Sequence, residues 1–91
     1  MVTWIRTESA DYLKSTTFDY VGLDDQTGAD VENEGQKVSA WRIDESGDAT
    51  HIHELFAVST VEDAHERLEN FMGLLTDPDH GPILDVCMEV L

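Results

Sequence analysis

The chain has little cysteine and no long apolar run, and each shortage excludes a class of protein. A single cysteine, Cys87, among 91 residues excludes an internal disulfide framework and a zinc cage built from several thiolates. No stretch approaches the roughly 18 apolar residues that a membrane-spanning helix needs, and the first residues lack the regions of a signal peptide. We therefore expect a cytoplasmic protein.

Positive charge is also scarce. Five lysines and arginines stand against twenty aspartates and glutamates, which gives a net charge of -15 at pH 7. Because no basic patch is present, we expect the chain to bind neither nucleic acid nor an anionic membrane. Hydrophobic residues make up 41% of the sequence, which is enough for the core of a single domain over residues 1–91.

The acids are scattered through every segment of the chain, and only Lys14 and Lys37 are lysines. This composition resembles the proteome-wide composition of extreme halophiles such as haloarchaea, which keep molar potassium in the cytoplasm. The Debye length is roughly 10 Å at 0.1 M salt and about 3 Å at 1 M, so concentrated salt screens most of the repulsion between carboxylates. The alternative is an acidic nucleic-acid mimic that inhibits a DNA- or RNA-binding protein by reproducing phosphate spacing.

The most regular segment predicts a long helix over residues 60–76. Its apolar residues, from Val61 to Leu75, follow the i, i+3, i+4 spacing of a helix with one buried stripe. Ser59 is the expected N-cap, and Glu62 would complete a capping box with it.

A β-hairpin is predicted over residues 37–57, around the sequence ESGD. With Ser46 and Gly47 as a two-residue loop, Trp41 lies opposite Ile52. A shift of the two-residue loop by one position would instead place Ile43 opposite Ile52, so the register stays open at this point.

At the end of the chain, apolar and polar residues alternate from Leu84 to Val90, which predicts a strand over residues 83–90. Residues 9–15 either form one helical turn or link two strands. Residues 24–35 contain five acids and two glycines and predict an acidic mobile loop. The predicted fold is α+β, a mainly antiparallel four- to five-stranded sheet with the long helix on one face and a C-terminal strand. The expected strands cover residues 2–7, 16–23, 37–44, 50–58 and 83–90.

The sequence THIHELF, residues 50–56, suggests a metal site. On a regular strand His51 and His53 project from one face about 6.7 Å apart, a spacing that permits two nitrogens to bind one zinc ion. A third ligand would come from His65 or His80, with Asp79 and Cys87 as further candidates. The alternative is two exposed histidines on the wet face of a strand, without a metal or other cofactor.

No catalytic motif stands out. Cys87 lies within the predicted last strand between Asp85 and Glu89, and is expected to be a small packing residue. The chain has neither the Gly-x-Ser-x-Gly motif that positions a serine nucleophile nor a phosphate-binding P-loop. We therefore expect a small non-enzymatic binding or regulatory protein.

Aromatic side chains suggest how such a protein would bind. One helix covers only one face of a sheet, so aromatic residues on the other face would form an exposed patch. A homodimer or another protein partner would then cover it. The candidates for this interface are Trp4, Phe18, Tyr20, Trp41 and Phe56.

Overall fold

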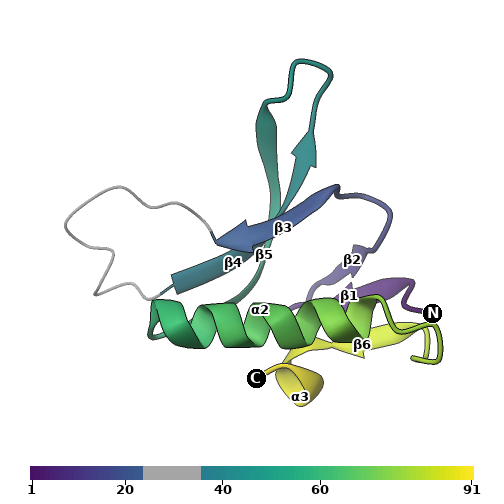
Figure 1. The fold of residues 1–91 in the computed structure, drawn as a ribbon. Helices are drawn as coiled ribbons and strands as arrows, with labels where there is room; N and C mark the ends of the chain where they lie inside the picture. The colour runs from purple at the N-terminus through teal and green to yellow at the C-terminus, as the bar shows by residue number, and fades with distance from the viewer. Residues whose placement is uncertain (24–35) are drawn as a thin grey trace.

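The computed structural model, described over residues 1–23 and 36–91, has the predicted α+β fold. The described strands are mostly antiparallel, but they form two three-stranded sheets rather than one larger sheet. Sheet A has the order β2-β1-β6 and sheet B the order β3-β4-β5 (Figure 1). The elements are β1 (Trp4–Arg6), β2 (Tyr12–Lys14), β3 (Tyr20–Leu23), β4 (Gln36–Ile43), β5 (Ala49–Val58), α2 (Val61–Leu75), β6 (Ile83–Asp85) and α3 (Val86–Glu89). The loop expected over residues 24–35 lies outside the described residues.

The hairpin of β4 and β5 is present, and its tip projects away from the body of the molecule (Figure 1). Neither predicted register is found, because Trp41 pairs with His51. Strand β5 contains two more residues than β4, and the pairing shifts at Ile52 and again at Leu55. Each extra residue makes a β-bulge, which changes the register in a way that a regular hairpin pattern does not predict.

The turn of the hairpin depends on Asp44 rather than on a two-residue loop. Its carboxylate Oδ1 accepts hydrogen bonds from the N–H groups of Ser46 and Asp48, both at 2.9 Å, and from the Ser46 hydroxyl at 2.7 Å. These bonds lower the pKa of Asp44, the Ser46 hydroxyl contributing most. Gly47 closes the turn with a φ of 88°, a conformation that side chains disfavour.

Strand β2 corrects the prediction of a helical turn or a simple link over residues 9–15. Tyr12–Lys14 pairs antiparallel with β1, after a turn in which the Asp11 N–H donates to Thr7 Oγ1 at 3.2 Å. Ala10 in this turn has a φ of 68°, which is uncommon for a residue with a side chain. The strand has only three residues, too few for an alternating pattern to be recognised in the sequence.

The predicted strand over residues 83–90 is wrong beyond Asp85. Strand β6 pairs in parallel with β1 and ends at Asp85, whose side chain caps α3 by accepting from the N–H groups of Cys87 and Met88. Val86 and Val90, four residues apart, are buried as on a helix, whereas Met88 is 80% exposed. A charged cap therefore ends the strand and begins a helical turn.

Helix α2 is confirmed and packs on sheet B, contacting β4 and β5 (Figure 1). Its N-cap is Thr60 rather than Ser59, because the Thr60 hydroxyl accepts from the Asp63 N–H at 3.1 Å. Phe71 is fully buried, and its ring lies 6.4 Å from that of Phe56 on β5. This contact fixes the helix on the sheet.

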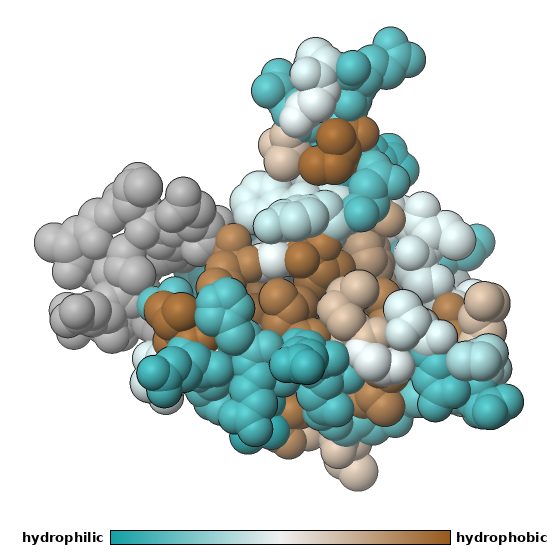
Figure 2. All heavy atoms as spheres, viewed as in Figure 1, coloured by the Kyte–Doolittle hydropathy of each residue, from teal (hydrophilic) through white to brown (hydrophobic). Residues whose placement is uncertain are grey.

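One hydrophobic core joins both sheets to the helix. The inward row of sheet A, Leu13, Ile5 and Leu84, is buried together with Leu55 and Phe56 of sheet B. In Figure 2 hydrophilic atoms cover the outward side of α2, and hydrophobic atoms show between the helix and the hairpin. In the described part of the chain, neither helix has the length and apolarity needed to cross a membrane.

Candidate functional site

The outward face of sheet A carries side chains in two rows of three. Successive residues of a strand point to opposite sides, so the residues that flank the buried Ile5, Leu13 and Leu84 point outward together. The strand pairing places them directly opposite one another. We name this set the sheet A outer face, with the rows Lys14, Trp4, Ile83 and Tyr12, Arg6, Asp85.

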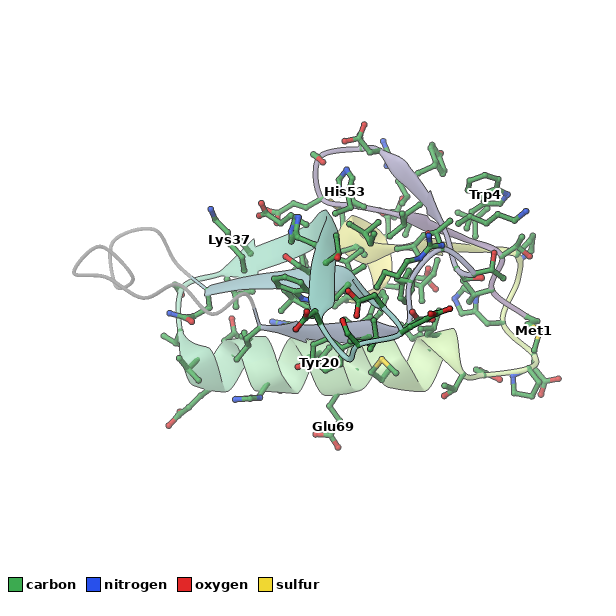
Figure 3. The ribbon with its side chains drawn as sticks, turned by 90° about the horizontal axis from the view of Figure 1, so that it is seen from above. Met1, Trp4, Tyr20, Lys37, His53 and Glu69 are labelled. Atoms are coloured by element: carbon green, nitrogen blue, oxygen red, sulfur yellow. The ribbon has the colours of Figure 1, made fainter. Side chains whose placement is uncertain are left out.

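Half of the sheet A outer face is apolar. Trp4, Tyr12 and Ile83 are 41%, 57% and 49% exposed, and together they line a shallow hollow. Figure 3 shows Trp4 on the side of the molecule opposite α2. An aromatic patch of this kind is typical of a surface that binds another molecule.

The charged half of the same face has more basic than acidic residues, which is unusual for this chain. Arg6 and Lys14 are two of only five basic residues, and Asp85 is the one acid in the two rows. The Arg6 guanidinium donates to Asp85 Oδ2 at 3.1 Å, and this bond raises the pKa of Arg6. Within the described residues the Lys14 ammonium forms no hydrogen bond or ion pair. The face thus has a net charge of +1 on a chain of -15.

The five aromatic residues predicted as an interface do not share one face. Phe56 is 1% exposed and belongs to the core, so it is not available to a partner. Phe18 and Trp41 are half-buried. Trp4 and Tyr20 are exposed, but Trp4 lies on sheet A and Tyr20 on sheet B. For the exposed residues the interface stays a prediction.

Tyr12 and Ile83 are the apolar surface residues that sequence reasoning missed. Both lie in three-residue strands, and both become neighbours of Trp4 or Arg6 only through the pairing of sheet A. Three residues such as Tyr12, Leu13 and Lys14 give no alternating pattern from which the sequence could place them on a surface.

On sheet B, Tyr20, Trp41 and His51 lie side by side on neighbouring strands. The Trp41 and His51 rings meet edge to face, with their centroids 5.0 Å apart. The Tyr20 ring lies over Gly22, where it would contact any added Cβ atom. These aromatic rings thus pack on their neighbours in the sheet, a structural role that explains their positions.

The two predicted metal ligands have different partners. His51 packs against Trp41, while His53 Nδ1–H donates to the Glu54 carbonyl at 2.6 Å and its Nε2 lies 3.3 Å from Asp11 Oδ2. The bulge at Ile52 separates them, so the regular strand spacing assumed for the pair does not apply.

His53 also borders a shallow hollow beside the turn between β1 and β2. Its lining includes Glu8 and Ser9, and the Ser9 hydroxyl donates to the same Asp11 oxygen at 3.1 Å. Glu8 accepts from the Ala57 N–H at 2.8 Å. The interactions of Asp11 with His53 and of Glu8 with Ala57 attach the turn to β5, which accounts for the polar residues gathered here.

The proposed third ligands lie elsewhere. His65 is exposed on α2, and His80 bonds to the Gly81 carbonyl and, at 2.6 Å, to Glu89 Oε1. These two bonds raise the pKa of His80. Within residues 1–23 and 36–91 no three His, Cys, Asp or Glu side chains are grouped as a metal site requires. The use of His51 and His53 as ligands stays a prediction.

Cys87 is exposed at the start of α3, which corrects its expected role as a packing residue in a strand. Its Sγ lies 3.9 Å from the Glu8 carbonyl oxygen.

The described acids are spread over the molecule. They lie in the turns, at the hairpin tip, on β5, along α2 and around β6, and none is buried. Glu62, Glu66 and Glu69 form a short row on the helix. Most of the described carboxylates therefore face solvent and its ions.

Comparisons of the chain with protein-family models, curated proteins and solved structures find no match. Its function is therefore argued from the geometry and chemistry of its own surface.

Proposed function

We propose that this protein is a small non-enzymatic binding module of a high-salt cytoplasm, and that it contacts a protein partner through the sheet A outer face. The observation that carries the proposal is the exposure of Trp4, Tyr12 and Ile83 side by side on a sheet face turned away from α2. Tryptophan and tyrosine supply much of the binding energy in protein interfaces because their rings bury large areas with few rotatable bonds.

The distribution of charge supports the high-salt part of the proposal. Acids in the turns, at the hairpin tip and along α2 repel one another in dilute buffer, and molar salt removes most of that repulsion. Apolar contacts do not weaken in this way. An aromatic surface is therefore a suitable binding surface for a highly acidic protein in concentrated salt.

The proposal is tested by photo-cross-linking at Tyr12 and at Tyr20. These tyrosines are 57% and 51% exposed but lie on different sheets, so they form a matched pair. Each is replaced in turn by p-benzoylphenylalanine, the protein is produced in its native host, and the cells are irradiated. We expect a discrete adduct from position 12 and little from position 20. Equal yields at the two positions, or no adduct at position 12, would refute the proposal.

A further inference from the structure

We infer that the partner of the sheet A outer face presents a short extended segment in which acidic residues and aromatic or aliphatic residues take turns at every second position, so that both kinds lie on the same side of the segment. This inference rests on the proposed function, because it names the ligand of the same face. It follows from the charge and the size of that face.

Charge is the first argument. The face combines Arg6 and Lys14 with one acid, whereas the other residues of the chain sum to -16. Lys14 lies directly opposite the exposed Trp4 on the neighbouring strand, and its ammonium group forms no hydrogen bond or ion pair within the described residues. A carboxylate that binds Lys14 would direct the side chain two residues along the extended segment toward the hollow lined by Trp4, Tyr12 and Ile83.

The salt concentration determines which charges of the protein interact with a partner. At a Debye length of about 3 Å in 1 M salt, an acidic segment interacts only with the groups that it touches. On this face two of those groups are Arg6 and Lys14. In dilute buffer the same segment is repelled by the whole chain, so its affinity should rise as salt is added.

Size is the second argument. Three strands about 4.8 Å apart, with three residues of about 3.3 Å each, give a footprint of roughly 10 by 14 Å. A standard protein interface takes about 800 Å² from each partner. The face alone is thus too small to hold a second copy of the chain in a stable dimer, but it matches a segment of a few residues.

The geometry of an added strand fits as well. Strand β2 is an edge strand of sheet A, and alternate backbone groups of an antiparallel edge strand point away from the sheet. The Lys14 carbonyl already accepts from the Thr17 N–H and hydroxyl, at 3.0 and 2.7 Å, so an added segment would pair at Tyr12. A segment paired with β2 would place every second side chain on the outer face, beside Tyr12 and Lys14.

The test uses two synthetic peptides in about 2 M KCl, a condition that screens long-range charge. In the first peptide aspartate and phenylalanine take turns at every second position, with threonine between them, and in the second lysine replaces aspartate. Binding to the whole chain is followed by calorimetry and by NMR shifts. We expect the acidic peptide to bind and to shift the signals of Trp4 and Tyr12, and the basic peptide to bind much more weakly.

Variants locate the contact. Trp4→Ala should weaken binding by about tenfold, as truncation of an aromatic anchor does, and Lys14→Glu by several fold. Lys14→Glu should also gain affinity for the basic peptide, an outcome that loss of folding would not produce. Tyr20→Ala, on the other sheet, should leave binding unchanged.

Three results would overturn the inference. The first is tighter binding of the basic peptide to the unmodified chain, and the second is peptide affinity that Trp4→Ala and Lys14→Glu do not alter. The third is a cross-link from position 12 that joins two copies of this chain. With any of these results, a cross-link found only at position 12 would still support the sheet A outer face as a binding surface. Absence of a cross-link at position 12 would refute both the binding face and the acidic segment.

Discussion

Replacement of Glu66 by glutamine should stabilise the protein in dilute salt, because Glu66 stands between two other glutamates on α2. Glu62 lies four residues before it and Glu69 three residues after it, so both are its neighbours on the helix surface. Each like-charge pair costs about 0.2–0.5 kcal/mol. Glutamine has nearly the helix propensity of glutamate. The free energy of unfolding should thus rise by about 0.4–1 kcal/mol at 0.1 M salt.

The assay is urea unfolding followed by circular dichroism in about 0.1 M and 2 M KCl, where the Debye length falls from about 10 Å to below 3 Å. The gain from Glu66→Gln should nearly vanish at the higher concentration. The control is Asp63→Asn, because Asp63 Oδ1 lies 3.5 Å from Arg67 Nε and attracts it. That variant should lose stability at 0.1 M and recover it at 2 M. A loss from Glu66→Gln at 0.1 M, or an equal gain at both concentrations, would refute the reasoning.

Three further predictions concern the fold. Asp85→Ala should cost about 1 kcal/mol of stability through the lost cap of α3, whereas Asp85→Asn keeps the cap, and equal unfolding midpoints would contradict this. Phe71→Ala should cost about 3–5 kcal/mol and Met72→Ala, at a 39% exposed site, far less, which urea titration would measure. Bonds to Gly81 and Glu89 raise the pKa of His80 in the folded state. The stability that protonated His80 adds is therefore full below the ordinary pKa of histidine, and it is lost as the pH rises through the pKa of His80 in the folded state. The difference in Tm between the unmodified protein and Glu89→Gln should therefore shrink from about pH 6 to pH 9, and a constant difference would count against this role.

Long-range periodicity was enough to predict α2, and a turn sequence was enough to predict the hairpin. Helix α2 repeats its apolar stripe over four turns, so the local choice of cap between Ser59 and Thr60 does not change the outcome. The hairpin was located by ESGD, but its register depends on the Asp44 side chain and on two bulges in β5. Neither feature appears in a pattern of alternating residues.

Short elements were ambiguous for a physical reason. Val86 and Val90 fit both a period of two and a spacing of four, and the Asp85 cap decides in favour of the helix. Of the sheet A outer face, Trp4 was predicted as an interface residue. Tyr12 and Ile83 could not be added to it, because their closeness to Trp4 depends on how strands far apart in the chain pair.

The central claim is that the surplus carboxylates are an adaptation to the ions around the molecule. The most direct test is the free energy of unfolding of the unmodified chain at about 0.1 M and 2 M KCl. A pair of like charges about 7 Å apart repels by about 0.6 kcal/mol in water, and screening removes roughly 0.25 kcal/mol of this between the two concentrations. A dozen such pairs predict a rise of about 3 kcal/mol. An unchanged or lower free energy of unfolding at 2 M KCl would contradict the claim.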